Sequence, residues 1–136
     1  MSTMIQMAAF LAKRIPKLKN GVRGRRKREN FLMWLAWNTS RGNACAVEVD
    51  GKLISVGVAR SIQKETDSRL PYCNDEQGKI LYVEHVAAKT KEGFLTLLTY
   101  VKGRWPQCEK IMFHRSKSQS QNKVYDMKIF MRKAFL

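Results

Sequence analysis

Acidic residues are scarce in this sequence, and its first 28 positions contain none. The 136 residues include 26 Lys and Arg against 11 Asp and Glu, which gives a formal net charge of +15. Nine of the basic side chains fall between positions 13 and 28, before the first acid, Glu29. A field of this sign attracts polyanions such as nucleic acid, anionic lipid or an acidic protein surface. A localisation signal and a solvated basic arm are also compatible with such a run.

Long hydrophobic runs are absent as well. The longest apolar stretch, at residues 31 to 37, is far shorter than the roughly 20 residues that span a bilayer. In the N-terminal stretch MSTMIQMAAFLAKRIPK the charges follow the apolar segment, and no small-residue cleavage site is evident, which argues against a secretory signal. We therefore expect no transmembrane segment and a cytoplasmic location.

Cysteine is limited to three widely spaced residues, Cys45, Cys73 and Cys108. Their spacing matches no metal-binding motif, so we expect no metal site and interpret all three as buried, inert thiols in a reducing compartment. Gly-rich Walker loops are missing, and no local motif indicates a Ser/His/Asp or Cys/His constellation. Because these motifs are absent, the sequence supports a prediction of the fold more than a prediction of catalytic activity.

The content of 44% hydrophobic and 10% aromatic residues is typical of a globular protein, and the length suits one core. Helical spacing of apolar side chains predicts a helix over residues 2 to 15, closed by Pro16. A flexible basic linker is expected at residues 20 to 28. A short helix at residues 28 to 37, apolar almost all round, requires burial against a sheet. We divide the chain into a basic N-terminal helix and linker, residues 1 to 27, and an α/β domain, residues 28 to 136.

Strand signals follow the second helix. Asp50-Gly51 between β-branched runs predicts a hairpin whose first strand ends at Val49 and whose second covers residues 52 to 61. After a polar loop at residues 63 to 79, strands are predicted at residues 79 to 88 and 109 to 115. His114 is interpreted as a polar residue at the end of the latter.

The helix between these two strands is predicted to begin at Thr90, a good N-cap, and to stop near Gly103 and Pro106. Residues 123 to 136 fit one helical face, although strand alternation through Tyr125 and Met127 remains open. The predicted order is α-α-β-β-β-α-β-α, a mixed sheet flanked by helices, with a basic N-terminal helical arm.

Two local features accompany this order: the strand–loop–helix LYVEHVAAKTKEGFLTLLTYV and the segment FMRKAF, which begins at Phe130. With them the order resembles the GNAT superfamily of N-acetyltransferases over roughly residues 28 to 136, and FMRKAF is similar to the family's aromatic-x-x-x-Gly-Phe signature with Phe130 at the aromatic position. Asn122 fits the Asn that often opens that helix, with a spacing one residue long. In layout the chain is also similar to the toxin-activating lysine acyltransferases and to GNAT-like internal virion proteins of short-tailed bacteriophages.

The resemblance implies a coenzyme A site in the loop at residues 89 to 93, where backbone N–H groups at the helix N-terminus would wrap the pyrophosphate. The family's loop is glycine-rich, whereas here only Gly93 remains and Glu92 adds a negative charge. If acyl-coenzyme A binds, its contacts would be Val86, Ala88, Lys89, Lys91 and Gly93.

The resemblance also implies a general base at Glu84, because family members often place a Glu on this strand to deprotonate the attacking amine. Strict alternation would put Glu84 and Val86 on one face and His85 on the other. An ion pair with a nearby Lys or Arg is an equally weighted interpretation of Glu84. The family's acid is a Tyr where this chain has Phe130, which leaves Tyr125 as a weak substitute. The closing strands of a full acetyltransferase would follow Leu136, so the resemblance implies that another subunit supplies them or that they are absent.

Three functions remain open on these residues. The first is a binding or structural protein whose acyl-coenzyme A site is degenerate and holds no cofactor. Its basic arm would bind an acidic polymer or protein, and the protein would belong to an assembly or to a virion interior. The second is an active N-acyltransferase that uses acyl-coenzyme A. The third is a nucleic-acid-binding regulator. The expected polyanion contacts are Lys13, Arg14, Lys17, Lys19, Arg23, Arg25, Arg26, Lys27 and Arg28.

Overall fold

A computed structural model describes residues 3–16, 18, 23–113 and 122–136. Its helices are α1 (Met4–Arg14), α3 (Arg25–Ser40), α4 (Lys91–Arg104) and α5 (Met127–Ala134), with a short 3₁₀ helix, η1 (Glu65–Arg69). Its strands are β1 (Ala44–Val49), β2 (Lys52–Ile62), β3 (Ile80–Ala88), β4 (Lys110–Phe113) and β5 (Lys123–Asp126). The strands form one sheet in the order β1-β2-β3-β4-β5, in which only β3 and β4 run parallel. The predicted class, a mixed α+β sheet flanked by helices, is confirmed.

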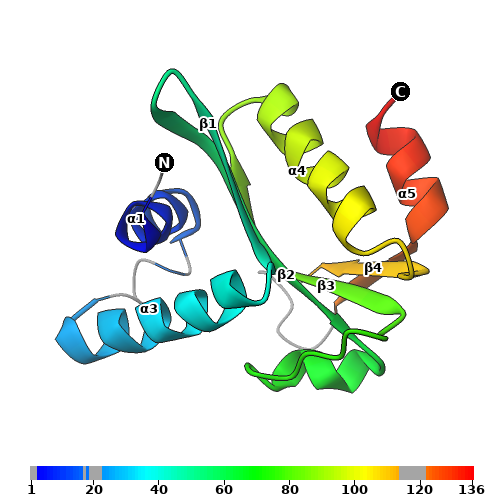
Figure 1. Ribbon diagram of the computed structural model, residues 1–136, viewed down its shortest axis with the longest axis horizontal. Coiled ribbons are helices and arrows are strands. Elements are labelled where there is room, and N and C mark those ends of the chain that lie inside the picture. The colour runs from blue at the N-terminus through cyan, green and yellow to red at the C-terminus, as the bar shows by residue number, and fades with distance from the viewer. Residues whose placement is uncertain (1–2, 17, 19–22, 114–121) are drawn as a thin grey trace.

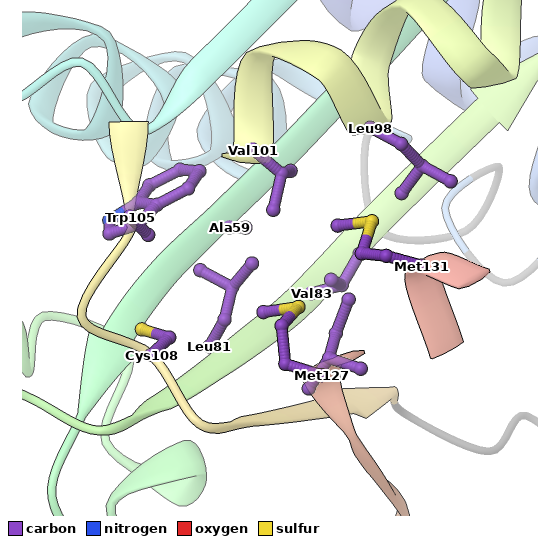
Figure 2. Packing of buried hydrophobic residues seen from close by; sticks show 10 residues of the cluster. Ala59, Leu81, Val83, Leu98, Val101, Trp105, Cys108, Met127 and Met131 are labelled. Carbon is purple, nitrogen blue, oxygen red and sulfur yellow. The ribbon is translucent and has the colours of Figure 1, made fainter. Parts of the chain in front are cut away.

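Helices cover both faces of this sheet. Figure 1 shows α1 and α3 on one face and α4 and α5 on the other, with the two chain ends on opposite sides. Beneath α4 and α5, apolar side chains from β2, β3 and β4 make one buried cluster, part of which is drawn in Figure 2. A second cluster joins α1 and α3 to β1 and β2, and includes the fully buried Leu11, Leu35 and Val56. The sheet therefore separates the cluster beneath α4 and α5 from the cluster that packs against α1 and α3.

The N-terminal helix α1 packs into the fold. Thr3 caps it in a reciprocal arrangement with Gln6, and its Met7, Phe10 and Leu11 are buried in the second cluster. The helix therefore contributes core as well as charge. The division of the chain at residue 27 stays a prediction.

The second helix begins earlier than its apolar pattern predicts. Because α3 starts at Arg25, the basic residues 25 to 28 form its first turn, and the prediction that they belong to a linker is wrong. Arg25 donates to Glu29 one turn later, at 3.1 Å, on the exposed surface. Trp34 is buried, as expected of a core residue, whereas Trp37 is half-buried.

The C-terminal segment differs from the predicted single helix. Residues 123 to 126 pair with β4 as strand β5, and α5 begins only at Met127. The change occurs at Asp126, whose Oδ1 accepts a hydrogen bond from the backbone N–H of Ile129 at 3.0 Å and so caps the helix. Strand alternation and helical spacing each describe one part of this segment.

Within the described ranges, no helix is long and apolar enough to cross a membrane. The same residues contain no group of three or more His, Cys, Asp and Glu side chains that could hold a metal ion.

Candidate functional site

A β-bulge in β3 decides where its polar side chains lie. Val58 of β2 pairs with His85, but the next residue, Ala59, pairs with Val83, so Glu84 has no partner in β2. An extra residue of this kind interrupts the alternation of a strand. The prediction that Glu84 and His85 lie on opposite faces is therefore wrong.

Both polar residues lie on the face away from α4. His85 contacts Trp34 of α3 edge-to-face, with ring centroids 5.5 Å apart. Glu84 reaches the buried Arg60 of β2, and its Oε1 accepts from the guanidinium at 3.2 Å. Val86, one residue further, packs instead against the cluster beneath α4. The bulge thus directs two consecutive side chains to the same side.

Arg60 is the centre of this polar arrangement and is only 1% exposed. Besides Glu84, its guanidinium donates to the backbone carbonyls of Asp67, Ser68 and Cys73, in the loop that includes η1. A buried guanidinium needs a counter-charge, because the desolvation of an unpaired ion is costly. Glu84 supplies it, as the alternative interpretation from the sequence allowed.

Tyr82 lies beside this ion pair, with its ring 5.2 Å from the Arg60 guanidinium carbon. Burial, together with the nearby negative charge of Glu84, raises the pKa of Tyr82 to about 12, although the positive charge of Arg60 acts in the opposite direction. The phenol therefore stays neutral at physiological pH and does not provide a proton acceptor beside Glu84.

The loop before α4 is closed by its own side chain. Thr90 Oγ1 accepts from the backbone N–H of Gly93 at 3.0 Å, so the predicted N-cap is confirmed. The Gly93 carbonyl accepts from the hydroxyl of the fully buried Ser55 at 2.9 Å. A Cβ at Gly93 would lie 3.2 Å from both hydroxyl oxygens. Gly93 therefore allows close packing of α4 on β2, and its N–H already has an acceptor.

The five residues expected at a coenzyme do not converge on one surface. Val86 faces the apolar cluster, whereas Ala88 is exposed at the end of β3. Lys91 is exposed in the first turn of α4, beside the exposed Glu92. Lys89 points to the other side of the sheet, where its Nζ lies 5.9 Å from the ring centroid of Phe10 in α1.

An open groove of about 600 Å³ lies between α4, β4, β5 and α5. Three aromatic rings stack along it: Phe130 is 5.3 Å from Phe113 and 5.8 Å from Tyr125, measured between centroids. Phe94 of α4 completes the aromatic lining, and Asp126 and Lys133 are the charged residues of the groove. Sequence reasoning found Tyr125 and Phe130 but missed Phe94 and Phe113, which only the β4–β5 pairing and the position of α4 bring beside them.

A separate small cavity of about 40 Å³ lies beneath α4, and Phe94 and Phe113 line both the cavity and the groove. This is also where β3 and β4 stop pairing: their last pair among the described residues is Val83 with Phe113, although β3 extends to Ala88. Val86 lines the cavity.

The expected polyanion contacts divide between two surfaces. Lys13 and Arg14 lie at the end of α1, and the Arg14 guanidinium carbon stacks 3.8 Å from the Phe10 ring centroid. The basic residues of the first turn of α3 are exposed, namely Arg25, Arg26, Lys27 and Arg28, as is Arg23 before them. Lys17, Lys19 and His114 lie outside the described residues.

Comparison with known proteins supports the fold but no family membership. No protein-family model and no curated protein matches the chain. Among solved structures, the chain is similar to the GphF GNAT-like decarboxylase in complex with isobutyryl-CoA, with a TM-score of 0.58 and 16% identity over 81% of this chain. The match spans 60% of that decarboxylase.

A second solved structure is a Staphylococcus aureus MU50 protein to which an acetyltransferase activity has been ascribed. It is 14% identical over 80% of this chain and 72% of its own, with a TM-score of 0.49, too low to support an inference. The chain has a GNAT-like fold, and at these identities the comparisons speak for the fold alone.

Proposed function

We propose that this chain is a binding protein on a GNAT-like fold with a degenerate acyl-coenzyme A site, and that its basic surface takes an acidic partner. The observation that carries this proposal is that the groups needed for acyl transfer already have partners within the protein. Glu84 is the counter-charge of the buried Arg60, and the Gly93 N–H is bonded to Thr90. A general base must be able to accept the substrate's proton, and a pyrophosphate site needs unbonded N–H groups.

The second candidate is an N-acyltransferase, and the aromatic groove favours it. About 600 Å³ lined by Phe94, Phe113 and Phe130 can hold the apolar acyl group of an acyl-coenzyme A, and ligand pockets are commonly apolar with few polar groups. Its candidate acid would be Tyr125, on the rim of the groove. This function requires Glu84 to leave Arg60, or another base to act.

Isothermal titration calorimetry with acetyl-coenzyme A separates the two. The binding-protein proposal predicts no heat of binding at millimolar ligand, and micromolar affinity would overturn it. If heat is measured, Phe113→Ala tests whether the groove is its source, with Phe135→Ala, at a 43% exposed position outside the groove lining, as the matched control. A loss for the first variant alone would place the coenzyme in the aromatic groove.

A further inference from the structure

A second groove, of about 380 Å³, lies on the other side of the sheet, between α1, the β1–β2 turn and the end of β3. Four of the residues that line it are basic and none is acidic: Lys13, Arg14, Lys52 and Lys89. The last three turns of α1, the hairpin and β3 are far apart in sequence, so only the fold brings these charges together. Sequence reasoning assigned Lys89 to a coenzyme and did not consider Lys52.

Among the described residues, no ion pair involves the four basic side chains of this groove. The ion pairs seen in that part of the chain belong to Arg25, Arg60 and Arg104. The floor of the groove is the ring of the buried Phe10, which both Arg14 and Lys89 approach. Stacking on the ring orients the Arg14 guanidinium before any ligand arrives, which lowers the entropy lost on binding.

We propose that this groove binds the phosphodiester backbone of a nucleic acid strand. The inference rests on the proposed binding function and assigns it a site and a partner class. Lys and Arg in a groove that tracks the backbone, with little dependence on sequence, are the usual means of binding single-stranded nucleic acid. Phosphate contacts of this kind supply most of the affinity of sequence-independent binding.

A polymer fits the surroundings better than a single phosphate. Ala9 of α1 lines this groove and also a depression between α1 and α3, which Arg28 lines as well. The basic residues of the first turn of α3 therefore begin on the opposite side of α1. The width of one helix, about 10 Å, separates them from the groove. A chain leaving the groove over α1 would meet them.

A membrane surface fits less well, because the one large aromatic ring that lines the groove, Phe10, is buried and cannot insert among lipids.

The triple variant Lys13→Ala, Lys52→Ala, Lys89→Ala tests the proposal. All three side chains are exposed, so the fold should survive, which circular dichroism and thermal unfolding would verify. The matched control removes the same charge from exposed sites elsewhere: Lys102→Ala, Lys110→Ala, Lys128→Ala.

Binding is measured by fluorescence anisotropy with labelled oligothymidine of about 20 nucleotides and a duplex of similar length, between 50 and 200 mM salt. Near 0.1 M salt the groove variant should bind the single strand about a hundredfold more weakly, roughly fivefold for each of three lost contacts. Its slope of log affinity against log salt should fall by about 2 on the single strand. The control should change affinity less than about threefold, and Lys→Arg at the three groove positions should keep the wild-type slope.

Equal losses of affinity in the groove and control variants would overturn the groove assignment, because the overall positive charge of the protein would then explain the binding. Wild-type binding to poly-glutamate but to neither oligonucleotide would uphold the proposed function and refute the nucleic acid partner. Binding to phosphatidylserine vesicles that depends on the three lysines, without oligonucleotide binding, would also refute it. No binding to any of these polyanions would remove the proposed function itself.

Discussion

The ion pair between Glu84 and Arg60 can be tested as a structural element. Removing one member of a buried pair costs about 3 to 5 kcal/mol, because the other charge is left in a low-dielectric environment. For Glu84→Ala we expect the lower end, about 3 kcal/mol, since Arg60 keeps the carbonyls of its loop and the Glu84 side chain is 16% exposed. Glu84→Gln keeps an acceptor oxygen without the charge, and we expect about 1 to 2 kcal/mol.

The assay is equilibrium unfolding in urea, followed by tryptophan fluorescence. A domain with 5 to 15 kcal/mol of stability tolerates a loss of about 3 kcal/mol, so all variants should still show a folded baseline. Arg60→Met alone should cost a similar amount. The double variant Arg60→Met, Glu84→Ala should cost clearly less than the sum, with a coupling of about 2 kcal/mol, because it leaves no unpaired buried charge.

A loss of less than about 1 kcal/mol for Glu84→Ala, with additive effects in the double variant, would refute this reasoning. A role for Glu84 as a base would then be compatible with its small contribution to stability. If an acyl transfer is detected, a catalytic role predicts that Glu84→Gln slows it by 10² to 10⁴ while stability barely changes. The two roles of Glu84 therefore separate in the same variant.

Three further predictions concern packing, capping and burial. Gly78→Ala should destabilise the protein by more than about 2 kcal/mol, since its Cβ would lie 2.6 Å from the Ile62 backbone; Gly103→Ala, in helix α4 with no atom in reach of a Cβ, should instead stabilise it by about 0.5 to 1 kcal/mol in the same urea assay. Thr90→Ala should cost about 1 kcal/mol through the lost cap, whereas Thr90→Ser should cost little. Burial raises the pKa of Cys108 from 9.0 to about 11, so the unfolded chain loses this proton first and stability should fall as pH rises from 9 to 11; Cys108→Ala should flatten that dependence, and an unchanged slope would contradict it.

Local signals predicted most of the fold. The Asp50-Gly51 hairpin forms as expected, with Asp50 and Gly51 both at positive φ, and Thr90 caps α4. These features depend on a few adjacent residues, so the sequence contains their cause. The strand–loop–helix from β3 to α4 is of the same kind, and it carried the GNAT-like fold.

The site was less accessible because its causes are tertiary. The bulge at Glu84 is a shift in register between β2 and β3, so the sequence of either strand alone does not predict it. Arg60 gave no signal, since a single Arg in a strand is usually exposed, whereas here it is buried under a loop whose carbonyls it binds. Strand β5 forms because β4 offers it an edge, which overrides the helical spacing of residues 123 to 126.

The placement of the two grooves bears directly on function. Acyl-coenzyme A joins an anionic, phosphate-bearing part to an apolar acyl group through an amide-bearing pantetheine arm, so its site must offer cations and an apolar groove on one continuous surface. In this protein the aromatic groove lies beside α4 and α5, with Lys133 as its cation, whereas Lys13, Lys52 and Lys89 line the groove beside α1. Helix α1 lies on the opposite side of the sheet from α4 and α5 (Figure 1). The last residues of β3 divide in the same way, with Val86 toward one side and Lys89 toward the other. Because the sheet lies between them, the cations of one groove and the aromatic rings of the other do not share one surface, which favours a polyanion on one face over a coenzyme shared by both.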